Sequence, residues 1–266
     1  MSNVDASTDK PRTGAREWSA SSVNIGRGCS HGCIYCYARA SALQNQFITG
    51  PEEWTTEVVD QAALARNFGK RSGVVMFPTI HDVTDAYLES SIVVLRKLLE
   101  AGNEVLVVTK AHLHCVERLC LEFANFKDRL RLRFTIGSLD ADLCKFWEPN
   151  APAPSERLAA LKYAYALGFS TSVSSEPMLA GRHEAVRLFN AVKHYVVDEV
   201  WFGVMNDVDH RVLELADDAD VDVVEVVNQL KFLQSDESVL KLYAALAHEP
   251  KVAWKDSIKA IVDRSR

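Results

Sequence analysis

Short runs of apolar and β-branched residues alternate with longer segments of helical periodicity along most of this chain. Six such runs predict strands, at residues 21–25, 73–78, 103–109, 131–137, 170–174 and 198–205. The segments between them gather apolar residues on one helical face; examples are SSIVVLRKLLEAG, HLHCVERLCLEF, SERLAALKYAYALG and RHEAVRLFNAVKHY. This alternation predicts an α/β fold with a parallel sheet and right-handed crossovers, either an open doubly wound sheet or a full or partial β/α barrel.

The strand predicted at 131–137 has two unlike faces. Its apolar side chains alternate with polar or small ones, so one face can pack on helices while the other is polar. A polar inner face suits a barrel whose interior serves a site, and in such barrels the reactive groups lie at the carboxyl ends of the strands. That rule gives these candidate positions: the loop after Ile25, Thr79 to Asp85, Lys110, Ser138, Ser175 with Glu176, and Asn206.

Composition narrows the class of protein. The 266 residues are 48% apolar and carry a formal net charge of −6, and no stretch approaches the roughly 20 apolar residues of a membrane helix. The acidic net charge argues against general DNA binding, because affinity for phosphate backbones comes largely from Lys and Arg.

The polar start of the chain lacks the apolar core of a signal peptide, so we expect a cytoplasmic protein. We also expect a flexible segment at 1–20, a core barrel at 21–210 and a helical extension packed on it at 211–266.

Three of the six cysteines, Cys29, Cys33 and Cys36, lie within eight positions in the arrangement C-x₃-C-x₂-C. Six unevenly placed cysteines do not make a disulfide scaffold. Thiolates are the usual ligands of iron–sulfur clusters, and three of them leave one iron of a [4Fe–4S] cluster open to a cofactor or substrate. The alternative is a zinc site completed by His31 or a distant residue. Zinc motifs usually contain two cysteine pairs, and the sequence has no second pair.

The cysteine motif, with the aromatic Tyr35 before its last cysteine, resembles the signature of radical-SAM enzymes. The surrounding GCSHGCIYCYAR resembles the branch of spore photoproduct lyase and DNA-repair-photolyase-like proteins, and VLVVTKA, FTIGSLD, WEPNAPAPSERL, SSEPML and GVMN follow in that branch's order. The resemblance spans residues 20–210. It implies a partial (β/α)₆ TIM-like barrel, and a [4Fe–4S] cluster that cleaves S-adenosylmethionine (SAM) to a 5′-deoxyadenosyl radical. It also implies an electron donor such as flavodoxin or ferredoxin, and a nucleic-acid lesion or nucleotide as one candidate substrate.

The resemblance also implies roles for residues near the strand ends. The implied SAM contacts are Tyr35, Thr79, Lys110, Thr135, Ser174 and Glu176. Lys110 would meet the SAM carboxylate or, alternatively, be an ordinary surface lysine. Many members carry a GGE-type segment that contacts the SAM amino group, and here it is replaced by PTIHD at 78–82. Backbone carbonyls of this segment are then expected to contact the SAM amino group instead. His81 and Asp82 in this segment are candidate catalytic residues that could bind substrate or transfer protons, with a polar turn as the alternative.

The other cysteines and the class of function complete the predictions. We expect Cys115 and Cys120 to pack as small apolar residues in a helix. Cys144 is a candidate hydrogen-atom donor to a product radical.

The leading hypothesis for the function is a radical-SAM enzyme that abstracts hydrogen from an unidentified substrate. The second is a non-catalytic iron–sulfur or zinc-binding protein that acts as a sensor or assembly module.

Overall fold

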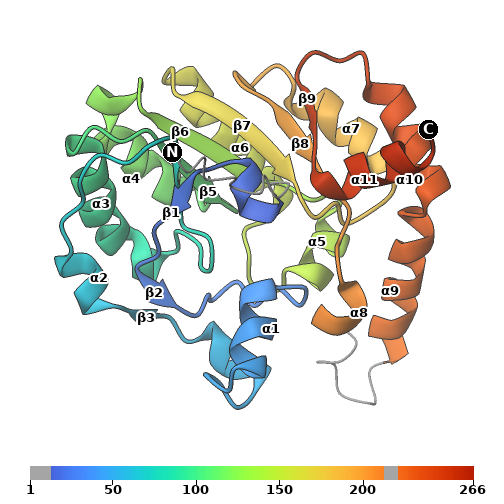
Figure 1. The fold of residues 1–266 in the computed structure, drawn as a ribbon, viewed down its shortest axis with the longest axis horizontal. Coiled ribbons are helices and arrows are strands. Elements are labelled where there is room, and N and C mark those ends of the chain that lie inside the picture. The colour runs from blue at the N-terminus through green and yellow to red at the C-terminus, as the bar shows by residue number, and fades with distance from the viewer. Residues whose placement is uncertain (1–12, 213–220) are drawn as a thin grey trace, which may run out of the picture.

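The computed structural model describes residues 13–212 and 221–266. Its main sheet has seven parallel strands that curl into a half-barrel, in the order β1-β4-β5-β6-β7-β8-β9 (Figure 1). The strands are β1 (Ser21–Ser22), β4 (Val75–Phe77), β5 (Val105–Thr109), β6 (Leu130–Thr135), β7 (Ser170–Ser175), β8 (Val200–Phe202) and β9 (Val252–Trp254). The first six overlap the six predicted runs, although β6 begins one residue before its run and β7 ends one residue after its run. The predicted partial barrel is therefore confirmed, with a seventh strand added from the C-terminal region.

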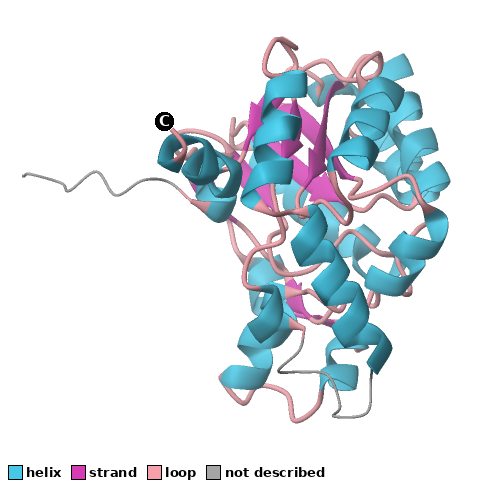
Figure 2. Cartoon of the chain, turned by 90° about the vertical axis from the view of Figure 1, so that its right-hand side faces the viewer, coloured by secondary structure: helices cyan, strands magenta, loops and turns pink. Residues whose placement is uncertain are grey.

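Helices lie between the strands along the chain, and several of them cover the outside of the main sheet (Figures 1 and 2). They are α1 (Tyr37–Gln44), α2 (Gln61–Ala65), α3 (Asp85–Glu100), α4 (Leu113–Glu122), α5 (Ala141–Trp147), α6 (Pro154–Ala166), α7 (Arg182–Val192), α8 (Val208–Arg211), α9 (Val221–Leu233), α10 (Asp236–Leu246) and α11 (Asp256–Arg264). Short 3₁₀ turns are η1 (Gly14–Glu17), η2 (Pro51–Thr55) and η3 (Ala124–Phe126). Where α3 ends, Gly102 takes a φ of 82°, a left-handed conformation that turns the chain into β5.

The two faces of β6 differ as the sequence predicts. Leu132, Phe134 and Ile136 are fully buried in the main core between sheet and helices. Arg133 lies on the opposite face, where its guanidinium stacks on the rings of Trp18 and Trp201 at 4.6 and 5.4 Å. The inner face of the half-barrel is therefore polar in part and lined by aromatic rings.

The two ends of the described chain meet beside β8 and β9. Lys255, the residue after β9, is completely buried, and its Nζ donates to the carbonyl of Gly14 at 2.6 Å and pairs with Glu17 Oε1 at 2.6 Å. The ammonium also lies 4.3 Å from the centre of the Trp18 ring. Of the segment expected to be flexible, residues 1–12 lie outside the described residues, while residues 13–20 pack against the C-terminal elements and, through the amide of Ala20, against Val74.

A small antiparallel sheet lies apart from the main one and leads into the cysteine motif. Its strands are β2 (Gly26–Arg27) and β3 (Val58–Val59), and Figure 2 shows them among the helices at one end of the molecule. Gly28 follows β2 with a φ of 83°, and a Cβ there would lie 2.0 Å from the carbonyl oxygen of Thr56. Only glycine fits this close approach of two backbones. Among the described residues, no helix has the length and apolar character required to cross a bilayer.

Candidate functional site

The three cysteines of the motif share one loop between β2 and α1. The amide of Cys29 donates to the carbonyl of Trp54 at 2.8 Å, and the amide of Cys36 to that of Cys33 at 3.2 Å. Cys33 is buried, while Cys29 and Cys36 are partly exposed, and all three are free thiols. The loop therefore presents three thiols close together, from a backbone that its own turns and η2 hold in place.

Burial disfavours the ionised form of two of these thiols, Cys29 and Cys33, so their pKa values lie above the usual range. It raises the pKa of Cys33 to about 12, an effect that the Lys110 ammonium opposes and that the charges of Glu148 and Cys36 increase. Burial also raises the pKa of Cys29 well above its usual value, with Asp82 and Cys33 adding to the rise. Cys33 thus interacts electrostatically with both Cys29 and Cys36, from the middle position of the motif. Thiolates gathered this way are stabilised by a bound metal, so the donor set fits an iron–sulfur cluster.

The segment 147–150, Trp-Glu-Pro-Asn, lies along the cysteine loop. The amide of Ile34 donates to the carbonyl of Trp147 at 3.0 Å, and Asn150 donates from its backbone amide to the carbonyl of His31 at 3.1 Å. The Asn150 side chain also donates to the carbonyl of Ser30 at 3.1 Å. These bonds hold the cysteine loop against the end of α5.

A buried charge network lies beneath this loop. Glu148 pairs with Arg157 and accepts from the hydroxyl of Tyr35, and the Glu148, Arg157 and Tyr35 side chains are all buried. Arg157 also donates to the carbonyl of Thr135 at 3.1 Å. Arg157 and Lys110 hold the pKa of Glu148 below its usual value despite burial. The sequence analysis assigned no role to Glu148 or Arg157, although both fall in the quoted stretch WEPNAPAPSERL, whose recurrence in the resembling branch was the available signal.

Lys110 lies inside this network and not on the surface. Its Nζ is 3.9 Å from Glu148 Oε1 and 5.7 Å from the centre of the Tyr35 ring, and its side chain is 17% exposed. The charges of Cys33, Glu148 and Asp82 together raise its pKa despite burial. The residue predicted at the end of β5 therefore carries its positive charge beside the cysteine loop.

Asp82 and His81 make contacts that order the strand ends. Asp82 accepts from the amides of Val83 at 2.7 Å and Lys110 at 2.9 Å, and lies 3.4 Å from Nδ1 of His31. His81 Nε2 accepts from the amide of Ile25 at 3.1 Å, and its Nδ1 lies 3.0 Å from the carbonyl of Asp82. Burial lowers the pKa of His81. Both ring nitrogens of His81 are thus occupied by backbone groups, as expected of a residue that positions its neighbours.

The remaining predicted contacts lie along neighbouring strands. Thr135 and Ser174 are paired in register on β6 and β7, and both are buried. The Ser174 hydroxyl finds no hydrogen-bond partner within the described chain. Thr79 is held by Asn24, which accepts from its amide at 2.7 Å. Burial raises the pKa of Glu176, and Lys255 opposes that rise, so Glu176 belongs to the region where the chain ends meet.

Cys144 lies on the inner side of α5 in the same apolar cluster as Cys33 and Tyr35. Its Sγ is 3.5 Å from the carbonyl oxygen of Ser138. Burial raises the pKa of its thiol to about 12. The structure thus places Cys144 near the cysteine loop as a neutral thiol, and its role as a hydrogen-atom donor stays a prediction.

Comparisons with known proteins bear on the fold and on the family of this chain. An uncharacterised protein of Acidianus two-tailed virus, ORF301, is 27% identical over 171 residues, which cover 59% of this chain and 55% of that protein. The match thus spans only about half of this relative's length. Among solved structures, SuiB of Streptococcus suis bound to S-adenosylmethionine superposes with a TM-score of 0.52 at 12% identity, over 88% of this chain and 50% of SuiB. A spore photoproduct lyase variant with a dinucleoside spore photoproduct superposes with a TM-score of 0.50 at 15% identity, over 88% of this chain and 75% of the lyase.

These two structural likenesses show that the half-barrel fold is shared. The model of one family, the radical SAM superfamily, matches residues 23–185 and so spans more than half of the chain. That range includes the cysteine loop and four strands of the half-barrel, β4, β5, β6 and β7. The chain therefore belongs to the radical SAM superfamily.

Proposed function

We propose that this protein is a radical-SAM enzyme in which Cys29, Cys33 and Cys36 hold a [4Fe–4S] cluster. A cluster on three thiolates keeps one iron free for SAM, and it supplies the electron that cleaves SAM to a 5′-deoxyadenosyl radical. The observation that carries the proposal is the placement of three neighbouring thiols beside the Lys110 ammonium in a chain of this superfamily. An electron donor such as flavodoxin or ferredoxin would supply the reducing equivalent.

In this proposal Lys110 binds the carboxylate of SAM. Its ammonium is largely buried and charged, and its nearest carboxylate oxygen, on Glu148, is 3.9 Å away, beyond a direct hydrogen bond. It therefore has donor capacity left for a ligand. Asp82 accepts from the backbone amide of Lys110, which fixes the end of β5 and the direction in which the side chain leaves it. Glu148 would keep the ammonium over the cysteine loop.

Thr135, Ser174 and Glu176 are proposed to bind the rest of SAM. Ser174 supports this most directly, because a buried hydroxyl without a protein partner is costly unless a ligand completes it. Tyr35 would flank the cluster or the adenine with its ring, while its hydroxyl is anchored on Glu148. Thr79 would help order the backbone carbonyls at 78–82 that face the SAM amino group. His81 and Asp82 are proposed to act by positioning these groups.

The substrate is proposed to be a molecule from which the radical abstracts hydrogen, with a nucleic-acid lesion or nucleotide as the first class to test. The photoproduct in the lyase structure supports that choice, while another structure of SuiB is bound to its precursor peptide. The net charge of −6 favours a local contact over general duplex binding. We propose that residues 21–210 form the catalytic core of a cytoplasmic enzyme, flanked by residues 1–20 and 211–266.

Anaerobic reconstitution tests the proposal. The parent protein should bind about four iron and four sulfide per chain and form 5′-deoxyadenosine from SAM when a reductant is present. Replacement of Cys29, Cys33 or Cys36 by Ala should abolish both, because a cubane left with two thiolates is unstable. Cys120→Ala is the matched control, since Cys120 is buried in α4 away from the loop. A protein that binds the cluster without forming 5′-deoxyadenosine would instead be the non-catalytic sensor or assembly module.

A further inference from the structure

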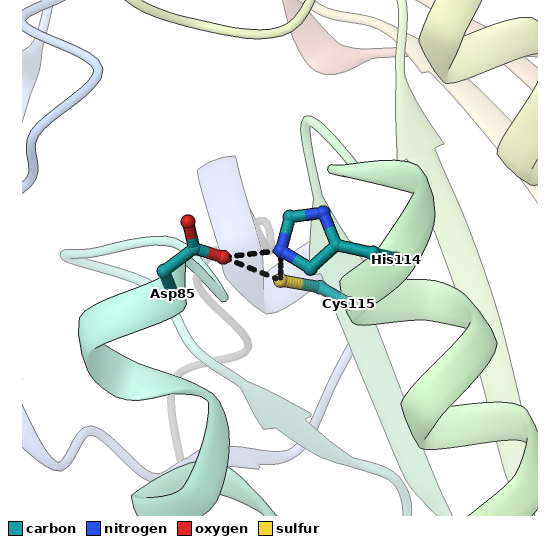
Figure 3. A group of neighbouring side chains, drawn as sticks. All are labelled: Asp85, His114 and Cys115. Atoms are coloured by element: carbon teal, nitrogen blue, oxygen red, sulfur yellow. Dashed lines mark hydrogen bonds and ion pairs between the residues drawn. The ribbon is translucent and has the colours of Figure 1, made fainter.

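A second group of metal-binding side chains lies outside the cysteine loop, where α3 and α4 begin. Asp85 is the first residue of α3, and His114 and Cys115 lie in the first turn of α4. Figure 3 shows the three side chains pointing at one another. In the part of the chain that the structure describes, this is one of two groups of three or more His, Cys, Asp or Glu residues whose ligand atoms all lie within 4.8 Å of one another.

The spacing of these atoms fits a tetrahedral zinc ion. Cys115 Sγ is 3.4 Å from His114 Nε2 and 3.7 Å from Asp85 Oδ1. With zinc bonds of about 2.3 Å to sulfur and about 2.0 Å to nitrogen or oxygen, tetrahedral angles place such pairs about 3.6 Å apart. Asp85 and His114 contact each other directly, and because both side chains are largely exposed they can separate to admit an ion. Only Cys115 is fixed in the core.

The second group shares His114 with the first and places two further polar side chains beside it. It consists of His112, His114 and Glu156, with ligand atoms again within 4.8 Å. Glu156 accepts from the amide of Leu113 at 3.0 Å, which fixes its carboxylate beside the start of α4. His112 Nδ1 is 3.8 Å from the same Glu156 oxygen, so the histidine and the carboxylate lie side by side at the edge of the first group.

We propose that Asp85, His114 and Cys115 bind one zinc ion, with the fourth position open on the solvent side. A mixed set of thiolate, imidazole and carboxylate is typical of zinc, and its two negative charges would balance the ion. Ligands from the starts of α3 and α4 would also tie two neighbouring helices together. The site is separate from the cysteine loop, although His112 Nε2 lies 3.2 Å from His31 Nε2 of that loop. Zinc at this place would therefore be in addition to the cluster iron.

Zinc content of the full-length protein tests the proposal. After desalting, the parent and the triple variant Cys29→Ala, Cys33→Ala, Cys36→Ala should each retain about one zinc per chain, since one tetrahedral set holds one ion. Competition with a chelator should show zinc affinity reduced by more than about 100-fold in Cys115→Ser, because loss of a ligand costs more than the 10–100-fold of an outer partner. Cys120→Ser, equally buried in the same helix, should bind zinc as the parent does.

Exposed variants keep the test independent of folding. Asp85 and His114 are largely exposed, so Asp85→Asn and His114→Ala should fold normally and still lose zinc affinity. Cobalt(II) added to the triple variant should give a thiolate-to-metal charge-transfer band that disappears in Cys115→Ser. Absence of bound zinc in the parent, full affinity in all three ligand variants, or loss of zinc with the cysteine loop alone would each overturn the proposal. None of these results depends on 5′-deoxyadenosine formation.

Discussion

Two buried ion pairs lie at different places in the half-barrel and have different roles. Glu148 and Arg157 are nine residues apart in the chain, and their side chains are 0% and 1% exposed beneath the cysteine loop. Glu17 and Lys255 come from opposite ends of the chain, with side chains 5% and 0% exposed. Replacing buried pairs with apolar residues often costs no stability, so such pairs call for a reason other than stability.

The surroundings of the two pairs suggest those reasons. Glu148 accepts a hydrogen bond from the Tyr35 hydroxyl and lies 3.9 Å from the Lys110 ammonium, and both of these groups belong to the proposed SAM site. Lys255 instead meets the Gly14 carbonyl and the Trp18 ring, so its contacts join the N-terminal turn η1 to the end of β9. We therefore interpret the first pair as the support of a site and the second as a clasp between the chain ends.

Removing the carboxylate of the first pair should have the larger effect. Glu148→Ala leaves Arg157 buried without its partner and should lower the free energy of unfolding by about 3–5 kcal/mol. Denaturant unfolding of the cluster-free protein measures this loss. The double variant Glu148→Leu, Arg157→Met should recover most of the stability while SAM binding stays weak, because Lys110 has lost its support. A loss below about 1 kcal/mol would match an exposed pair instead and contradict the burial.

Acid should weaken the same region. Arg157 and Lys110 hold the pKa of Glu148 below its usual value, and His31 and Lys110 lower that of Asp82. A carboxyl group with a lowered folded pKa stabilises the protein above its unfolded pKa, near 4, and that contribution is lost as pH falls through the folded pKa. The denaturant concentration at the unfolding midpoint should therefore decrease as the pH is lowered below about 4. In Glu148→Gln this decrease with pH should be less steep. An unchanged slope in Glu148→Gln would remove Glu148 from this account.

Short-range patterns predicted most of the fold. All six predicted strand runs overlap a strand, and the alternation at Leu132, Phe134 and Ile136 identified the buried face of β6 correctly. The three residues of β9 carry too short a pattern to be recognised, and β9 joins the sheet only through its pairing with β8. Glu17 and Lys255 are separated by nearly the whole chain, and no local sequence pattern predicts a contact between residues so far apart in the sequence.

The site was predictable where spacing or strand position carried the signal. Cysteine spacing pointed to the loop, and the strand-end rule selected Lys110, which the structure places beside Cys33. Glu148 and Arg157 were not singled out, because charged residues in a loop and a helix ordinarily face water. Their burial depends on how α5 and α6 close over the loop. Cys115 was expected to pack as a small apolar residue because it falls in a helical stretch. Its contact with Asp85 joins two different helices, so no local pattern in the sequence could show it.

A smaller effect is expected from Lys110→Met, which keeps the length of the side chain and removes its charge. A charge-assisted hydrogen bond to the SAM carboxylate in a partly buried site contributes about 1.5–3 kcal/mol. SAM affinity should therefore fall by about 10- to 100-fold, with normal iron and sulfide content. Equilibrium binding of SAM to the reconstituted protein measures this, and the exposed Lys70→Met serves as control. Parent-like affinity in Lys110→Met would show that the lysine does not contact SAM.

The smallest change is expected at the clasp. Glu17→Gln removes the charge that faces Lys255 but keeps an oxygen that can accept, and the Gly14 carbonyl and the Trp18 ring still face the ammonium. The loss should be about 1–2 kcal/mol, that of one weakened hydrogen bond to a charged group. Denaturant unfolding measures this loss. Cluster content and SAM affinity should match the parent, because no atom of the clasp contacts the cysteine loop among the interactions of the described residues.

Glu176, a proposed SAM contact, provides the strictest test of this prediction. The negative charge of Glu17 adds to the rise in the pKa of Glu176, so Glu17→Gln should let Glu176 ionise more easily. If SAM affinity changed in Glu17→Gln while stability did not, the clasp would be coupled to the site through Glu176, and the division between the two ion pairs would fail.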